Sequence, residues 1–201
     1  MKTDQRIVRA MAELLRVQGY AATGIQQLAK AADAPTGSIY HHFKGGKVEI
    51  AARALRESGA VYIQLLPLLL DRHPDLDTAI EAAFTAAAED IEHTGWANMC
   101  PVGTVTGEIA DTEPALREVA AEVIESWIDQ GTAYFAQRGL STTDARAAMY
   151  AVLAALEGAF ILARGQRSTE PLLAAGRAMA TYVATLPLRT TQPITADHPF
   201  S

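Results

Sequence analysis

Apolar residues recur at helical spacing along almost the whole chain, and no stretch alternates with the period of a strand. Near the N-terminus, for example, Ile7, Met11, Leu14 and Leu15 share one face of a helix. The pattern predicts an all-α fold of about nine helices. They cover residues 3–18, 25–32, 35–43, 47–66, 76–92, 104–110, 114–137, 143–164 and 170–186.

Glycine and proline divide these helices into larger units. Gly19 is placed as a helix stop, a Lys-Gly-Gly break covers residues 44–46, and Pro67 is expected to end or kink the helix over 47–66. The stretch 93–103 is read as irregular. We expect an N-terminal helix-turn-helix domain over 1–46, a helical bundle over 47–187 and a flexible tail over 188–201.

Composition narrows the class of protein. The chain has 201 residues, of which 49% are hydrophobic, and this excludes a disordered chain. No uninterrupted apolar run approaches the roughly 18 residues of a membrane span, and the charged N-terminus is unlike a signal peptide. A lone cysteine, Cys100, forms no internal disulfide or cysteine-rich zinc site. We therefore expect a cytoplasmic protein without contact to a membrane.

Charge is distributed unevenly along the chain. The net charge is −6, but residues 1–56 hold nine Lys and Arg against four Asp and Glu, whereas residues 57–201 hold eight against nineteen. A basic head of +5 on an acidic body of −11 is typical of a local site for a polyanion, although chance clustering is the alternative.

The basic head contains the pattern of a helix-turn-helix, with short helices over 25–32 and 35–43. Ala29 is small enough for the second helix to cross the first. Asp33 occupies the turn position that needs a left-handed backbone, which Asp tolerates. Ile39 and Phe43, four residues apart, give the second helix its buried face.

Specific residues in this region resemble the DNA-binding domain of the TetR family of repressors. The resemblance extends over about residues 5–55 and is carried by Ala-Lys-Ala-Ala at 29–32, Gly-Ser-Ile-Tyr-His-His-Phe at 37–43, and Lys47. In two departures from the family pattern, Asp33 replaces the turn glycine and Pro35 replaces a serine. The second departure removes a backbone N–H and a hydroxyl that would hold phosphate.

The resemblance implies that helix 35–43 enters the major groove, and that Thr36, Tyr40 and His41 supply direct readout. Gly37 would permit close approach to DNA, and Lys47 would neutralise a phosphate. The candidate DNA-binding residues are Gln26, Gln27, Thr36, Gly37, Ser38, Tyr40, His41 and Lys47. Packing is the alternative for Tyr40 and is favoured for His42. Adjacent histidines point about 100° apart on a helix, so we expect no metal site.

The last two helices suit pairing between two copies. Helix 143–164 carries a surface of small residues, and helix 170–186 carries an apolar stripe; these are Ala147, Ala151, Ala154, Ala155 and Gly158, then Leu172, Gly176, Met179, Val183 and Leu186. The resemblance implies a homodimer through both helices. The alternative is that both surfaces face only the chain's own core.

The middle helices, over 76–137, are expected to hold a small ligand. The candidate ligand-binding residues are Tyr62, Leu66, Phe84, Trp96, Met99, Cys100, Trp127, Tyr134 and Phe160, because large aromatic and sulfur-containing side chains line apolar pockets. Core packing is the alternative for each. The segment 98–112, with Cys-Pro-x-Gly at 100–103, resembles the LmrA/YxaF-like branch of TetR regulators, and Pro-x-Leu-Arg at 114–117 and Trp127 agree with that branch. The resemblance implies an apolar, often aromatic effector. We expect no cofactor.

These observations favour a ligand-responsive transcriptional repressor that binds a palindromic operator as a dimer, with helix 47–66 transmitting the signal between domains. The alternatives are a small all-α enzyme, for which no nucleophile, phosphate-binding or metal motif is evident, and a scaffold that does not bind DNA. For Cys100, the role of an inert buried thiol is favoured over that of a redox sensor. Glu108 and Asp111 are either polar groups of the pocket or exposed charges. The operator, the regulated genes and the effector are not specified by the sequence.

Overall fold

The computed structural model describes residues 1–97, 99–109 and 112–189. Within these ranges the chain forms helices and no sheet, which confirms the all-α class. The ten helices are α1 (Thr3–Gln18), α2 (Ile25–Ala31), α3 (Thr36–His42), α4 (Gly46–Tyr62), α5 (Leu65–Leu70), α6 (Leu76–His93), α7 (Pro101–Ile109), α8 (Pro114–Gln137), α9 (Thr142–Gln166) and α10 (Glu170–Ala184).

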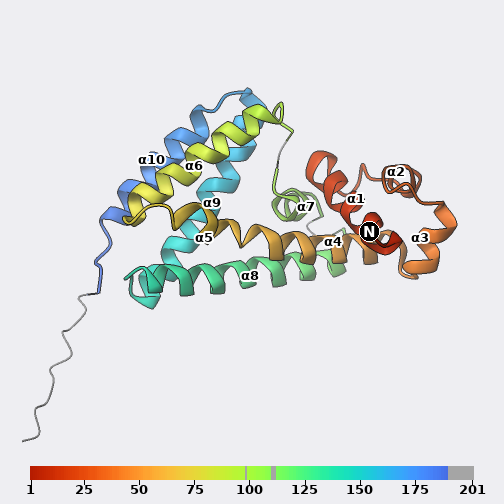
Figure 1. Ribbon diagram of the computed structural model, residues 1–201, viewed down its shortest axis with the longest axis horizontal. Helices are drawn as coiled ribbons and strands as arrows, with labels where there is room; N and C mark the ends of the chain where they lie inside the picture. Colours follow the sequence, from red (N-terminus) through yellow and green to blue (C-terminus); the bar gives the residue numbers. More distant parts are fainter. Residues whose placement is uncertain (98, 110–111, 190–201) are drawn as a thin grey trace, which may run out of the picture.

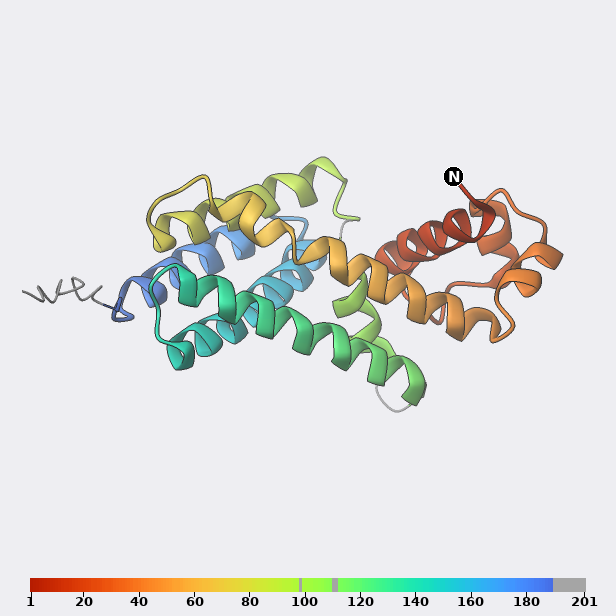
Figure 2. The ribbon, with the colours of Figure 1, turned by 60° about the horizontal axis from the view of Figure 1, so that its bottom comes forward.

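The molecule is elongated, with a small head at one end and a larger bundle at the other (Figure 1). Helices α1 to α3 form the head. Helix α4 leaves the head and runs beside α8 into the body, and both views show this pairing (Figure 2). Helices α6, α9 and α10 complete the bundle, while α7 lies between bundle and head. Helices α4 and α7 are therefore two elements through which a signal from the body can reach the head.

The head packs around α1 and the buried residues of α3. Ile39 and Phe43 are almost fully buried, as predicted, and so is Ala29. Asp33 adopts the expected left-handed backbone, with φ at 46°. The Arg6 guanidinium donates hydrogen bonds to the carbonyls of Ala32 and Asp33, at 3.1 and 2.9 Å, and so fastens this turn to α1.

The predicted helix over 47–66 divides into two. Helix α4 ends at Tyr62, and the short helix α5 begins at Leu65. Pro67 does not end a helix; it lies in the first turn of α5. The first N–H groups of a helix have no intrahelical acceptor, so a proline there removes no hydrogen bond.

Helix α7 begins at Pro101, three residues before the predicted start. Proline is favoured at the first helical position, and Cys100 precedes it as a cap. The Thr104 N–H donates to the Cys100 carbonyl at 2.9 Å, and the Gly103 N–H donates to its sulfur at 3.3 Å. The predicted end of this helix at Ala110, and Asp111, lie outside the described residues.

The apolar stripe of α10 packs inside the chain's own bundle. Leu172, Gly176 and Val183 are buried, and a Cβ on Gly176 would lie only 2.7 Å from the Cβ of Phe84 in α6. The prediction that this stripe pairs two copies is therefore wrong. A glycine at the crossing of two helices allows their backbones to approach, and here it closes α10 on α6.

Helix α9 has an exposed apolar side. Tyr150, Ile161 and Leu162 are between 47% and 62% exposed, whereas Met149 and Ala159 face the core. By length and composition alone, α9 is also the one helix in the described part of the chain that is long and apolar enough to cross a membrane. Glu157 interrupts the apolar residues of this helix, so they form no continuous run of about 18.

The start of the predicted tail contacts the bundle. Leu188 pairs with Leu140 in an isolated bridge, and the Arg189 guanidinium donates to the Leu140 carbonyl from both Nε and Nη2, at 2.8 and 2.6 Å. The remainder of the predicted tail, residues 190–201, lies outside the described residues.

The crossing of α6 and α10 yields a stability prediction. Gly176→Ala is expected to lower the free energy of unfolding by about 1–3 kcal/mol, because the added methyl collides with the base of the Phe84 side chain. Urea unfolding at fixed protein concentration measures the effect. Gly107→Ala is the matched control: its Cβ meets nothing within 4 Å, so the change should raise stability by about 0.5–1 kcal/mol. Equal effects at both positions would contradict the account.

Candidate DNA-binding surface and ligand cavity

Helix α3 presents a polar surface to solvent. Thr36, Gly37 and His41 are exposed, Tyr40 is 51% exposed, and Ser38 is half-buried. The opposite face of α3 is held in the core by Ile39. The short helix is therefore fixed on one side and free on the other, as a helix that enters a major groove must be.

Gly37 packs against no other residue in the described part of the chain. A Cβ at this position would meet no atom within 4 Å. A helix interior normally disfavours glycine, because glycine loses more backbone entropy than alanine on folding. The absence of a side chain at residue 37 therefore favours close approach of an external molecule.

The polar side chains next to α3 differ in their surroundings. Gln26 and Gln27 are both exposed, but Gln27 exchanges two amide hydrogen bonds with Gln18, at 2.8 and 2.9 Å. The Lys47 ammonium lies 3.9 Å from the centroid of the Tyr20 ring, and burial lowers its pKa. Lys47 is thus partly withdrawn into the joint between head and body. Lys44, which the sequence reasoning did not select, is exposed directly after α3.

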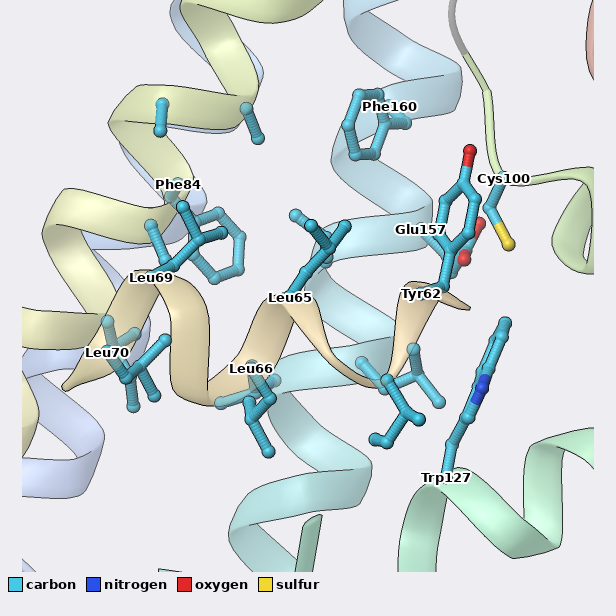
Figure 3. Close-up of a pocket in the computed structure, with 18 of the residues that line it drawn as sticks. Tyr62, Leu65, Leu66, Leu69, Leu70, Phe84, Cys100, Trp127, Glu157 and Phe160 are labelled. Atoms are coloured by element: carbon cyan, nitrogen blue, oxygen red, sulfur yellow. The ribbon is translucent and has the colours of Figure 1, made fainter. Parts of the chain in front are cut away.

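A cavity of about 440 Å³ lies inside the bundle (Figure 3). Its wall comes from the end of α4, from α5, α6, α8 and α9, and from the segment before α7. Seven of the nine candidate ligand-binding residues line it, namely Tyr62, Leu66, Phe84, Met99, Cys100, Trp127 and Phe160. The sequence pattern did not single out Leu65, Leu69, Leu70 or Glu157, which also line the cavity.

The two other candidates do not line this cavity. Trp96 has a left-handed backbone, with φ at 66°, and its N–H donates to the Ile91 carbonyl, so it closes the turn after α6. The Tyr134 hydroxyl donates to Asp71 at 2.6 Å and accepts from Arg138 at 2.9 Å. Tyr134 therefore helps to fasten the connection after α5 to α8.

Trp127 joins the cavity wall to α4. Its indole N–H donates to the Gly59 carbonyl at 2.8 Å, and this bond is buried. Gly59 also packs against Val123, and a side chain on Gly59 would collide with it. A buried donor without an acceptor costs about 1–3 kcal/mol, so this bond fixes the orientation of the ring.

One end of the cavity is polar. Figure 3 shows Cys100, Glu157 and Tyr62 close together, with Trp127 below them. The Cys100 thiol lies beside the Glu157 carboxylate. Burial raises the pKa of Glu157, and burial next to this carboxylate raises the pKa of Cys100 well above its usual value. Cys100 is 6% exposed, so its environment favours the inert thiol over a reactive thiolate.

The body is bound to the head by hydrogen bonds at the end of α1. The N–H groups of Tyr20 and Ala21 donate to the two carboxylate oxygens of Glu108, at 2.6 and 2.7 Å. Arg164 of α9 donates to the Val17 carbonyl at 2.9 Å. Glu108 is therefore no pocket group; it connects α7 to the loop that precedes α2. We call these bonds the Glu108 clamp and the Arg164 contact.

A fixed recognition helix on a basic head, joined to a helical body, defines a helix-turn-helix regulator of transcription. Comparison with protein families agrees: residues 7–54 match the family of bacterial regulatory proteins called tetR, and residues 77–178 match the transcriptional regulator LmrA/YxaF-like C-terminal domain. The chain belongs to the TetR family and carries an N-terminal DNA-binding domain. It is a regulator of transcription, not an enzyme.

Individual relatives support this assignment. The regulator LmrA of Bacillus subtilis is 30% identical over 169 residues, which cover 84% of this chain and 90% of LmrA. YxaF of the same organism is 29% identical over 169 residues, covering 84% and 88%. The crystal structure of a TetR-family regulator from Cytophaga hutchinsonii has the same fold, with a TM-score of 0.78, 22% identity, and coverage of 94% and 96%.

The open space at Gly37 yields a prediction that separates folding from DNA binding. Gly37→Ala is expected to raise the free energy of unfolding by about 0.5–1 kcal/mol, while it weakens DNA binding by about tenfold because the methyl occupies the approach path. Fluorescence anisotropy with duplex DNA and urea unfolding measure the two effects. Gly107→Ala should give the same stabilisation with unchanged DNA affinity. Unchanged affinity in Gly37→Ala would remove residue 37 from the interface.

Proposed function

We propose that this chain is a ligand-responsive repressor that acts in the cytoplasm as a homodimer. Two heads bind the half-sites of a palindromic operator. A small apolar or aromatic effector enters the cavity and favours a state in which the heads no longer match the operator. The observation that carries the proposal is that α7 begins beside the cavity, directly after Cys100, and contacts the head near its other end, through Glu108.

The exposed side of α3 supports the DNA-binding role. Thr36, Tyr40 and His41 read base edges, and Gln26 reaches a base or a phosphate. Lys44 supplies a phosphate contact from its exposed position, whereas Lys47 contributes charge from its place beside Tyr20. The helix has no Arg, Lys, Asn or Gln, so DNA shape carries part of the specificity.

The outward sides of α9 and α10 support the homodimer. Tyr150, Ile161 and Leu162 form an apolar side of α9 that the described part of the chain leaves exposed. On α10 the small residues Ala174, Ala178 and Ala184 are exposed, so a second copy can approach closely there, with Arg177 among them. Burial of these side chains in a four-helix interface removes apolar surface from water, which is the main favourable term in association.

The contacts around α7 support the coupling of cavity to DNA. A ligand that displaces Cys100 or Met99 shifts the start of α7, and the Glu108 clamp transfers the shift to the loop between α1 and α2. The Arg164 contact acts on the same end of α1 from α9, which carries Glu157 and Phe160 of the cavity wall. A ligand with different affinity for the two states changes operator affinity by the same factor.

The test uses duplex DNA from upstream of the chain's own gene. We expect a dimer to bind one duplex with an affinity that falls steeply as salt rises, and to bind a scrambled duplex at least about a hundredfold more weakly. Saturation with N-phenyl-1-naphthylamine, a neutral aromatic probe whose fluorescence rises on burial, should lower operator affinity about tenfold. Fluorescence anisotropy and analytical ultracentrifugation give the readouts. A monomer that ignores duplex DNA at low salt would refute the proposal.

A further inference from the structure

At the polar end of the cavity, the Glu157 carboxylate has no lysine, arginine or histidine beside it in the described part of the wall. Glu157 lies in the cavity wall, and its neighbours there are apolar, aromatic or thiol groups. Burial raises its pKa, and within the described part of the chain the Cys100 thiol is the one side chain that lowers it. Removing a carboxylate from water is costly unless a partner compensates its charge.

The second acidic residue of the wall has different surroundings. Asp90 lies within electrostatic range of Arg16 of α1, and so does the Tyr62 hydroxyl. No lysine, arginine or histidine belongs to the wall described here, so the cavity has acidic groups and no basic group of its own. Its electrostatics therefore favour positive charge, and they favour it at Glu157.

The fold makes room for this carboxylate. Gly103, in the first turn of α7, has no side chain, and a Cβ there would collide with the Glu157 carboxylate. The Tyr62 and Trp127 rings flank the same end of the cavity, while Leu69 and Phe84 lie toward the other end (Figure 3). Aromatic faces attract cations electrostatically, and a hydrocarbon wall suits an apolar body.

We infer that the cavity selects a hydrophobic cation, whose ammonium group pairs with the Glu157 carboxylate between Tyr62 and Trp127 and whose apolar body extends toward Leu69 and Phe84. This inference rests on the proposed function, because it specifies the chemistry of the effector. The Cys100 thiol lies on one side of the Glu157 carboxylate. The remaining oxygen lone pairs face the ammonium group and accept from its N–H or contact its N-methyl groups. The ion pair forms in a place from which water is largely excluded, so charge contributes strongly to affinity.

The test compares two probes of the same shape. The cation is 2-(trimethylammoniomethyl)naphthalene, and the neutral probe is 2-neopentylnaphthalene, in which carbon replaces the nitrogen. Binding to the full-length protein is followed by Trp127 fluorescence in a Trp96→Phe background and by displacement of N-phenyl-1-naphthylamine. The wild-type cavity is expected to bind the cation at least about tenfold more tightly than the neutral probe.

Glu157→Gln keeps the shape of the side chain and removes its charge. It is expected to abolish the preference for the cation while the affinity for the neutral probe changes less than about twofold. The matched control, Asp90→Asn, should retain most of the preference. Thermal unfolding verifies that each variant is folded, and the wild-type comparison of the two probes tests the inference without any variant.

The possible results separate this inference from the function on which it rests. Equal wild-type affinity for both probes, or a preference that survives Glu157→Gln, overturns the cation site and leaves a neutral ligand cavity intact. Failure of the cation, the neutral probe and N-phenyl-1-naphthylamine alike to bind overturns both. A preference of tenfold that disappears in Glu157→Gln alone supports the inference.

Discussion

The arrangement of head and body depends on one carboxylate. Glu108, near the end of α7, accepts hydrogen bonds from two successive backbone N–H groups, those of Tyr20 and Ala21. Bonds to a charged acceptor are about twice as strong as neutral ones, and two parallel bonds fix direction as well as distance. The loop between α1 and α2 therefore follows α7. Because α2 and α3 are packed on α1, the recognition helix follows as well.

Close contacts between helices make the rest of the body stiff, so a shift of α7 is passed on through the Glu108 clamp. Gly59 lets α4 approach α8, and the Trp127 indole locks the pair through a buried hydrogen bond. Gly176 likewise lets α10 approach α6 closely. The cavity is thus enclosed by helices that resist deformation. The start of α7, with the thiol cap of Cys100 and the space at Gly103, is where an occupant meets the element that reaches the head.

The parts that the sequence predicted are those governed by local rules. The left-handed turn at Asp33 and the buried pair Ile39 and Phe43 follow from residue type and a spacing of four, and the structure confirms them. Contacts between distant segments were beyond such reasoning. Glu108 and Tyr20 are separated by 88 positions, and nothing in either segment indicates the other. The sequence likewise did not indicate a role for Glu157, because it is a single acidic residue within an apolar helix pattern.

Two differences show how a helical pattern misleads. The stripe of α10 was predicted correctly as apolar, but periodicity does not say whether such a face meets its own chain or a second copy. Tyr134 has the size of a pocket residue, yet its hydroxyl binds Asp71 and Arg138. Pro67 illustrates the opposite case, since a helix breaker is harmless in a first turn.

Hydrogen exchange at the Tyr20 and Ala21 amides tests the clamp most directly. In the free protein both amides should be protected by Glu108, and saturation of the cavity with N-phenyl-1-naphthylamine should accelerate their exchange by about tenfold as the clamp loosens. Glu108→Gln should show fast exchange at both amides with and without the probe. Unchanged protection of Tyr20 and Ala21 in the wild-type protein, with the cavity occupied and the operator released, would contradict the account.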